Sequence, residues 1–203
     1  AVVSGRTAVS VAGLPAFSVS EINNLPDCDV LIDFSQPEAF DTVIDYCRHR
    51  KIPLLSGTTG IIERQRQQMS ELALVVPVLW ASNFSLGVAV LNDLVQRAAA
   101  ALQQWPVHIS ETHHVHKKDA PSGTALTLGE SVRRAEGQNP LYTSHREGEV
   151  VGDHTVKFSG PGEFIELRHN ALDRDIFARG ALEAAIRLHG KAPGLYQFNE
   201  LML

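Results

Sequence analysis

Short apolar runs alternate with amphipathic segments in the first part of the chain. The runs at residues 29–34, 53–56 and 76–81 have the length and composition of buried parallel strands. Helices are expected between them, the first ending near residue 50 and the second covering residues 62–74. This order of strand, helix, strand, helix and strand predicts a parallel sheet of the βαβ type.

The first of these helices has the clearest local signals. Ser35 is expected to cap it, with Pro37 in the first turn and Glu38 completing a capping box. Its core-facing stripe consists of Phe40, Val43, Ile44 and Cys47. Before it, residues 7–11 and 16–19 are possible short strands, and residues 21–26 form a polar turn.

The second part of the chain predicts a long helix, a short strand at 107–109 and a helix that starts at Pro121. The stripe of the long helix is Gly87, Leu91, Leu94, Val95, Ala98 and Leu102. After a polar linker at 136–140, strands of a second sheet are expected at 145–153, 155–158 and 164–169, with turns at 159–162. The last amphipathic helix contains Phe177, Ala181, Ala184, Ala185 and Leu188 and stops before Gly190.

Composition excludes several classes of function. The chain has 203 residues, of which 44% are hydrophobic and 20% charged, as in a soluble globular protein. A net charge of −5 argues against a nucleic-acid surface, so any anion site must be a local basic pocket. No apolar run approaches the length of a membrane span. The two cysteines, Cys28 and Cys47, are expected to be free thiols in a reducing cytoplasm.

The densest chemistry lies at residues 111–124, which read E-T-H-H-V-H-K-K-D-A-P-S-G-T. Three histidines and two lysines crowd a predicted loop that enters a helix, where free backbone N–H groups favour a carboxylate or phosphate. Gly123 allows a ligand to approach this backbone closely. Imidazoles beside such a site can supply a proton near neutral pH. The natural ligand is therefore an anionic substrate that must be protonated.

A zinc site is a weaker explanation for His113, His114 and His116. Zinc ligands on a helix are usually four residues apart and are joined by a further cysteine or carboxylate. The spacing H-H-x-H on a loop fits this poorly, and no metal is predicted.

Two further loops follow predicted strands at the edge where parallel sheets bind ligands. In the G-T-T-G loop, small residues allow a cofactor near the backbone, although an ordinary strand-to-helix turn would also explain the motif. The A-S-N-F loop can serve simply as the start of a helix capped by Asn83 or Ser85. Both interpretations stay open on the residues alone. The two loops contain Gly57, Thr58, Thr59 and Gly60, and Ala81, Ser82, Asn83 and Phe84.

The segment at 111–124 resembles the signature E-x-H-H-x-x-K-x-D-x-P-S-G-T-A of the dihydrodipicolinate reductases (4-hydroxy-tetrahydrodipicolinate reductases). The positions that fit are Glu111, His113, His114, Lys117, Asp119, Pro121, Ser122, Gly123, Thr124 and Ala125. Residues 81–87, 146–148, 150–155 and 169–181 resemble other blocks of the family. The connection between the second and third of these blocks is shorter here than in many members, which puts the outer strands and any oligomer contact in doubt.

The resemblance implies reduction of 4-hydroxy-tetrahydrodipicolinate to tetrahydrodipicolinate with NADH or NADPH, in lysine and diaminopimelate biosynthesis. It makes His113 the acid/base residue and Lys117 a general acid. It assigns substrate binding to His114, Ser122, Gly123 and Thr124. It assigns cofactor binding to Gly57, Thr58, Thr59, Ala81, Ser82, Asn83 and Phe84.

The predicted fold class is α/β, with a Rossmann-like parallel sheet followed by an α+β substrate domain with an open sheet. The expected domains are 1–84 for the nucleotide, 85–180 for substrate and oligomerisation, and 181–203 as a helix and tail that return to the first domain. The resemblance also implies a cytoplasmic homotetramer acting on a small dicarboxylate, without nucleic acid or membrane. A Rossmann domain opens with G-x-G-x-x-G, and no such motif is present, so we expect a chain that lacks its first part.

Two alternatives belong to other classes. A semialdehyde dehydrogenase would need a nucleophilic cysteine in the second domain, and both cysteines lie in the first. A non-catalytic fragment that binds dicarboxylates but holds no cofactor is the second alternative, because the glycine-rich loop for the pyrophosphate is absent.

Overall fold

The computed structural model describes residues 2–3, 10–11, 13–136 and 139–203. The chain divides into two compact units, which are described separately. Unit 1 contains residues 1–81 and 183–197, and unit 2 contains residues 82–182 and 198–203. The tail predicted as one piece at 181–203 is therefore shared between the two units.

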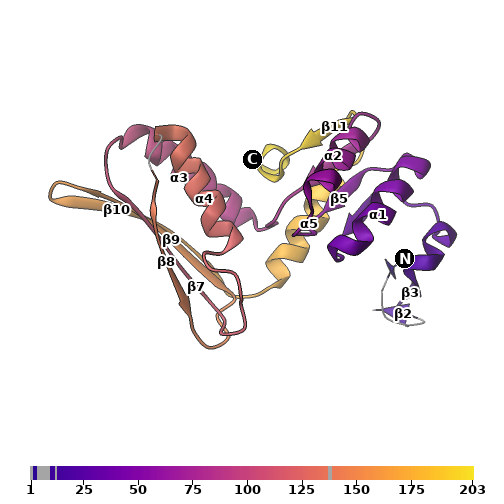
Figure 1. The fold of residues 1–203 in the computed structure, drawn as a ribbon, viewed down its shortest axis with the longest axis horizontal. Coiled ribbons are helices and arrows are strands. Elements are labelled where there is room, and N and C mark those ends of the chain that lie inside the picture. Colours follow the sequence, from indigo (N-terminus) through magenta and orange to yellow (C-terminus); the bar gives the residue numbers. More distant parts are fainter. Residues whose placement is uncertain (1, 4–9, 12, 137–138) are drawn as a thin grey trace. The chain divides into compact units, whose positions relative to one another are not determined.

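Unit 1 is built on a parallel four-stranded sheet, as the apolar runs predict (Figure 1). Its strands, in spatial order, are β11 (Gly194–Tyr196), β6 (Pro77–Trp80), β5 (Leu54–Ser56) and β4 (Leu31–Asp33). The crossover helices are α1 (Pro37–Arg50) and α2 (Glu63–Leu72). They bury Phe40, Ile44 and Leu72 against strand residues such as Leu54 and Val78. The predicted strands and helices of this region are thus confirmed, whereas β11 was not predicted.

The start of α1 differs from the predicted capping box. Gln36 is the N-cap residue and makes no side-chain cap hydrogen bond. Ser35 instead donates its hydroxyl to Gln36 O at 3.3 Å, and its backbone N–H donates to Asp33 Oδ1 at 3.0 Å. The predicted buried stripe is confirmed, and the helix ends at Arg50 before Lys51 in a left-handed conformation.

The first residues form a small sheet beside α1. Its strands are β1 (Val2–Val3), β3 (Leu14–Phe17) and β2 (Ser10–Val11). The strand predicted at 7–11 lies partly outside the described residues. The polar turn predicted at 21–26 is wrong, since a 3₁₀ helix, η1 (Val19–Asn24), occupies most of it. This helix buries Ile22 against Leu25 and Tyr46, an apolar contact that the surrounding polar residues conceal in the sequence.

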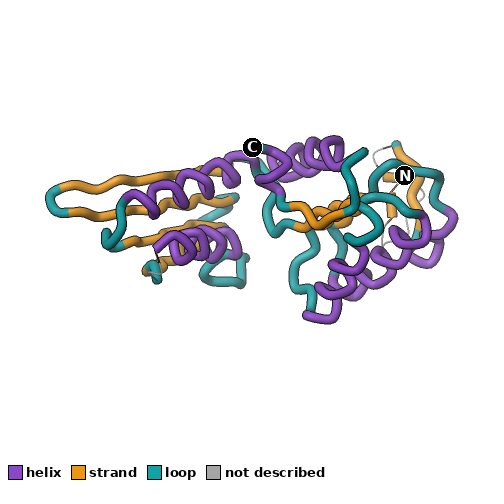
Figure 2. The backbone as a smooth tube through the Cα atoms, turned by 90° about the horizontal axis from the view of Figure 1, so that it is seen from above, coloured by secondary structure: helices purple, strands orange, loops and turns teal. Residues whose placement is uncertain are grey.

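Unit 2 contains a mixed four-stranded sheet, which is open on one face. In spatial order it consists of β10 (Glu163–Ala171), β9 (Gly152–Gly160), β7 (Val107–His113) and β8 (Leu141–Arg146). Strand β8 is parallel to β7, and the other pairs are antiparallel. Strands β9 and β10 form the long hairpin at the left of Figures 1 and 2. Gly162 in its turn has φ +82°, a conformation that favours glycine.

Two strand predictions for unit 2 are wrong. Residues 147–151 form a turn rather than the middle of a strand, because Gly148 has a positive φ and Glu147 donates its N–H back to His113 O at 2.8 Å. Strand β7 runs to His113, four residues beyond its predicted end. The polar residues Glu111 and His113 therefore lie on a strand and not in a loop.

Two helices of unit 2, α3 (Leu86–Ala101) and α4 (Gly123–Glu136), cover one face of this sheet. The other helices are α5 (Asp175–Leu188), which continues into unit 1, and α6 (Phe198–Met202). Val95 on α3 and Leu128 on α4 pack with Ile109, Val156 and Phe158 of the sheet in one core. The stripe predicted for α3 is correct at Leu91 and Val95 but wrong at Leu94, which is 44% exposed. Within the described part of the chain, no helix is long and apolar enough to cross a membrane.

Candidate active site

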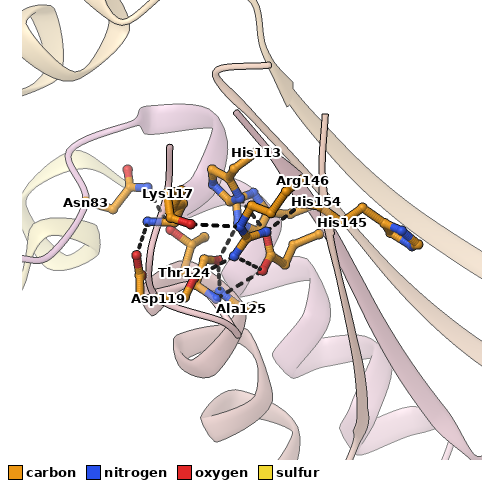
Figure 3. Close-up of polar contacts among 11 residues, drawn as sticks. Asn83, His113, Lys117, Asp119, Thr124, Ala125, His145, Arg146 and His154 are labelled. Atoms are coloured by element: carbon orange, nitrogen blue, oxygen red, sulfur yellow. Dashed lines mark hydrogen bonds and ion pairs between the residues drawn. The ribbon is translucent and has the colours of Figure 1, made fainter. Parts of the chain in front are cut away.

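Strand alternation turns Glu111 and His113 toward the helices. Along β7, Val107, Ile109, Glu111 and His113 are buried, and the residues between them face the open side of the sheet. Both neighbouring strands add polar residues to the same buried face. In the register, Glu111 lies beside Ser144 of β8 and His154 of β9, and His113 lies beside Arg146 of β8. The end of an apolar strand face thus becomes a polar cluster (Figure 3).

Glu111 is the centre of this cluster and is only 2% exposed. Arg146 binds its carboxylate with both ends of the guanidinium, Nη1 to Oε2 at 3.0 Å and Nη2 to Oε1 at 3.1 Å. Burial opposes ionisation of this carboxyl, but hydrogen bonds from Arg146, Ser144 and His113 outweigh it and lower its pKa to about 2. Glu111 is therefore a carboxylate throughout the physiological pH range.

His113 donates from Nδ1 to Glu111 Oε2, so its other nitrogen, Nε2, is the one left for chemistry. No hydrogen bond among the described residues uses Nε2. A side chain at Gly152 would come within 3.2 Å of that atom, so glycine keeps the space beside it open. Burial lowers the pKa of His113; Glu111 partly restores it, and the charges of Lys117 and Arg146 lower it again.

His154 links the cluster to the start of α4. Its ring packs edge-on against His113 with centroids 5.0 Å apart, and Nε2 lies 3.0 Å from Ser122 Oγ. Burial, followed by the charge of His113, lowers the pKa of His154 to about 4, so this ring is neutral at pH 7. Its Nδ1 is buried without a hydrogen-bond partner.

Ser122 caps α4 and is fully engaged within the protein. Its Oγ accepts the N–H of Ala125 at 3.2 Å, and its own N–H donates to Glu111 Oε1 at 3.3 Å. The helix therefore begins at Gly123, two residues later than predicted. Ser122 was expected to bind a substrate carboxylate through its N–H, and in this structure that N–H is occupied by Glu111.

Lys117 lies on the loop between β7 and α4, with its ammonium 2.8 Å from Asp119 Oδ1. Burial opposes ionisation of Asp119, but the hydrogen bond and charge of Lys117 lower its pKa below the usual value. The N–H of Gly123 acts on the same carboxylate. Lys117 and the helix start thus already share an anion in the free protein.

Asn83 and Thr124 connect two motifs that the sequence assigned to different ligands. Asn83 Nδ2 donates to Thr124 Oγ1 at 3.0 Å (Figure 3). The Thr124 hydroxyl accepts this hydrogen bond, so its own O–H remains a donor. Asn83 Oδ1 also accepts the N–H of Ser85, which in turn caps α3. The predicted cap is confirmed for Ser85.

The remaining histidines of the loop form no metal site. The rings of His114 and His116 are 6.2 Å apart, and His116 is exposed. In the described ranges there is no group of three or more His, Cys, Asp or Glu side chains with metal-binding geometry.

In unit 1, the buried carboxylate of Asp33 fixes the G-T-T-G loop at the end of β5. Asp33 Oδ2 accepts hydrogen bonds from Ser56 Oγ at 2.7 Å and Thr58 Oγ1 at 2.8 Å. Trp80 Nε1 donates to the carbonyl of Thr58 at 2.8 Å. The Thr58 hydroxyl therefore points into the protein rather than toward a ligand. Thr59 and Gly60 are exposed beside it and leave the loop backbone accessible.

Family models account for almost the whole chain. Residues 3–84 match the dihydrodipicolinate reductase N-terminus, and residues 87–202 match the dihydrodipicolinate reductase C-terminus. The chain belongs to the dihydrodipicolinate reductase family. The 4-hydroxy-tetrahydrodipicolinate reductase of Stenotrophomonas maltophilia (strain R551-3) is 54% identical over 204 aligned positions, which cover 100% of this chain and 85% of the relative. That of Xanthomonas axonopodis pv. citri (strain 306) is 54% identical over 193 positions, 95% of this chain and 81% of the relative.

Solved structures share the fold. A dipicolinate-bound dihydrodipicolinate reductase from Paenisporosarcina sp. TG-14 has a TM-score of 0.77 at 24% identity, covering 93% of this chain and 79% of that one. The C. glutamicum DAP dehydrogenase in complex with DAP has a TM-score of 0.58 at 15% identity, covering 98% and 85%. The predicted α/β fold class is therefore confirmed.

Membership of the dihydrodipicolinate reductases confirms the resemblance read from the sequence and makes this chain one of a family of oxidoreductases. Because the chain matches the models of both parts of the family, the alternative of a dicarboxylate-binding fragment without enzymatic activity is not favoured. Arg146 and His154 were noted in the sequence only as parts of matching blocks. The strand register that brings them to Glu111 depends on pairing across the sheet, which no local pattern encodes.

Proposed function

We propose that this chain reduces 4-hydroxy-2,3,4,5-tetrahydrodipicolinate to tetrahydrodipicolinate with NADH or NADPH, a step of lysine and diaminopimelate biosynthesis. The observation that carries the proposal is the carboxylate of Glu111 on Nδ1 of His113, beside the start of α4 and Lys117. This arrangement joins a proton donor to an anion site. A dicarboxylate that must gain a proton is the substrate that needs both.

The substrate clamp consists of Lys117, His114, Gly123 and Thr124. The ammonium of Lys117 and the N–H of Gly123 already act on the Asp119 carboxylate, which shows the kind of group they favour. A substrate carboxylate replaces Asp119 there. The Thr124 hydroxyl keeps its proton for an acceptor because it receives a hydrogen bond from Asn83. Ser122 contributes by holding the helix start rather than by direct contact.

The proton comes from Nε2 of His113. In the free protein, the pKa of this imidazole is below 6.5, mainly because of burial. Two substrate carboxylates bring negative charge and raise that pKa, so the ring takes up a proton as the substrate binds. The reaction removes water from the ring and adds a hydride at C4 and a proton at C3. Glu111 keeps Nδ1 protonated, and Nε2 delivers the proton to C3.

The cofactor loops are those at Gly57–Thr59 and Ala81–Phe84. A reduced nicotinamide nucleotide supplies the hydride when it is bound. The loop backbone fits such a group because it is exposed beside Thr59 and is held in place by the hydrogen bond between Thr58 and Asp33. Thr58 acts through its backbone, and Phe84 also acts only through its backbone because its ring is buried against Phe198. The proposed cofactor is either NADH or NADPH.

The proposal includes a cytoplasmic homotetramer. Two free cysteines, Cys28 and Cys47, are in keeping with a reducing compartment. The open face of the second sheet exposes large apolar residues such as Leu141 and Phe164, which a second subunit would cover. The proposed functional division is 1–84 for the nucleotide, 85–180 for substrate and assembly, and 181–203 as a helix and tail that return to the first domain, of which residues 183–197 belong to unit 1. A monomer in sedimentation velocity would contradict the assembly.

Substitution of His113 by alanine tests the function. Turnover is expected to fall by ~10²–10⁴-fold, while the dissociation constant for pyridine-2,6-dicarboxylate changes little, because a general acid acts mainly in the transition state. His49→Ala, an exposed histidine on α1, is the matched control and should keep full turnover. Unchanged turnover in the His113 variant would refute its role. Wild-type binding of the dicarboxylate without binding of NADH or NADPH would return the fragment alternative.

A further inference from the structure

Arg146 at the end of β8 uses every N–H of its guanidinium inside the site. Two of them hold the Glu111 carboxylate. Nε donates to Lys117 O at 3.2 Å, Nη2 to Asp119 O at 2.5 Å and Nη1 to His145 O at 2.6 Å. The five donors of one side chain thus meet five acceptors (Figure 3). Two of the acceptors belong to Glu111 on the strand that carries His113, two belong to the loop that carries Lys117, and the carbonyl of His145 belongs to β8 itself.

Glu111 transmits this contact to the rest of the site. Each of its oxygens accepts a hydrogen bond from Arg146 and another from a residue of the proposed machinery, and Ser144 also donates to this carboxylate. Oε2 accepts from His113 Nδ1, and Oε1 accepts from the N–H of Ser122 at the start of α4. A buried carboxylate with this number of partners has one orientation only.

We propose that Arg146 is the positioning residue of this site: through Glu111 it sets the orientation and tautomer of His113, and through two backbone carbonyls it places the loop of Lys117. The expected loss of turnover on substitution of Arg146 rests on the proposed function. The contacts that support it are independent of which substrate is bound.

The proton shared between His113 Nδ1 and Glu111 explains why a cation must bind the Glu111 carboxylate. A buried carboxylate without a compensating charge would compete with His113 for the proton on Nδ1. If the protonated ring gave its Nδ1 proton to Glu111, neutral His113 would be left with its one proton on Nε2, and a neutral imidazole is a far weaker acid than the imidazolium. The charged and titratable groups that face His113 are Glu111 on its own strand, Lys117 on the loop, Arg146 on β8 and His154 on β9. Of these, Arg146 is the cation that binds the Glu111 carboxylate directly, through both Oε1 and Oε2.

Lysine cannot replace this arginine. A lysine ammonium has three donors at one point, whereas the five acceptors around Arg146 lie in several directions around a planar fork. Arg146→Lys therefore keeps the charge and loses the geometry. Arg146→Gln loses both. The two variants separate the electrostatic role of the side chain from its positioning role.

The experiment combines nuclear magnetic resonance with kinetics on the full chain. Long-range ¹H–¹⁵N spectra of histidine-labelled protein report the tautomer and titration midpoint of each ring, and the His113→Gln spectrum assigns His113. Wild type, Arg146→Lys and Arg146→Gln are compared. Arg97→Gln, an exposed arginine paired with Asp93 on α3, is the matched control.

We expect neutral His113 in the wild type to carry its proton on Nδ1. In Arg146→Gln, loss of a nearby positive charge should raise the midpoint of His113 by about one pH unit. The limb of the pH–turnover profile should move by the same amount, with turnover lower by roughly 10- to 100-fold, less than loss of the acid itself. Arg146→Lys should keep a midpoint near that of the wild type but lose turnover and raise KM, because the Lys117 loop is released. Arg97→Gln should match the wild type in all readings.

A folded Arg146→Gln protein whose His113 keeps the wild-type tautomer and midpoint would overturn the proposal. If that variant does not fold, Arg146→Lys decides, since wild-type turnover and KM in that protein would equally overturn it. Failure of the proposed function looks different: the wild type would have no reductase activity, while the tautomer of His113 would still depend on Arg146.

Discussion

Substitution of Gly123 by alanine should separate folding from ligand binding at the start of α4. The ideal Cβ of residue 123 meets no atom within 4 Å, and the backbone there is not left-handed. An alanine at this first helical position costs nothing in packing. It should stabilise the fold by ~0.4–1 kcal/mol, because the unfolded chain loses conformational freedom.

Alanine keeps the backbone N–H, and the Asp119 carboxylate on which that N–H acts lies more than 4 Å from the ideal Cβ of residue 123. A substrate carboxylate in the same place should therefore bind the alanine variant as tightly as the wild type. Gly123→Pro, which fits a first helical position but has no N–H, should lose one hydrogen bond to a charged group; that loss costs ~1.5–3 kcal/mol and weakens binding by roughly 10- to 150-fold. Calorimetry with pyridine-2,6-dicarboxylate measures the affinity, and thermal unfolding measures the stability.

Gly129→Ala, further along the same helix, is the contrasting variant. A Cβ at Gly129 would lie 1.8 Å from the Tyr142 hydroxyl, so this protein should be less stable. If Gly123→Pro folds and binds the dicarboxylate as tightly as the wild type, no carboxylate accepts the N–H of Gly123, and the proposed clamp is wrong.

Two predictions concern protons. His113 has a pKa below 6.5 in the free protein, so binding of pyridine-2,6-dicarboxylate at pH 7 should take up a fraction of a proton at this residue. The measured binding enthalpy should then vary with the ionisation enthalpy of the buffer. In His113→Gln this dependence on the buffer should disappear. His154 has a folded pKa of about 4 against an ordinary value of 6.5, so the unfolded chain binds the proton more readily and stability falls as pH drops from 6.5 toward 4. The free energy of unfolding should fall by about 3 kcal/mol in full, of which about 2 kcal/mol is lost by pH 5. Urea unfolding at pH 7 and pH 5 measures this fall, which should be smaller in His154→Gln than in the wild type. An equal fall in both proteins would mean that other groups control the loss of stability in acid.

Elements with strong local signals could be predicted from the sequence. The strands β4, β5 and β6 are short apolar runs between helices, and periodicity alone marks the buried face of α1. Strand β11 has only three residues and no pattern, and its pairing with β6 comes from far along the chain. Tertiary pairing, rather than local preference, makes it a strand.

The candidate site was predictable as a list of residue types but not as a network. The resemblance identified His113, Lys117 and the start of α4. Competition within the protein changes two of the predicted roles: Ser122 gives its N–H to Glu111, and Thr58 gives its hydroxyl to Asp33. A sequence does not reveal which partner a donor chooses. That choice depends on the register of distant strands and on burial.

The hydrogen bond between Asn83 and Thr124 would make the binding of the two proposed ligands interdependent. Asn83 belongs to the loop proposed for the nicotinamide, and Thr124 to the clamp proposed for the substrate. A ligand that orders either side chain orders its partner as well, and the second ligand then meets an already arranged group. Linkage requires the effect to be reciprocal, so whatever factor the nucleotide adds to the affinity of the dicarboxylate, the dicarboxylate adds to that of the nucleotide. One side-chain contact would thereby couple the two proposed ligands in a ternary complex.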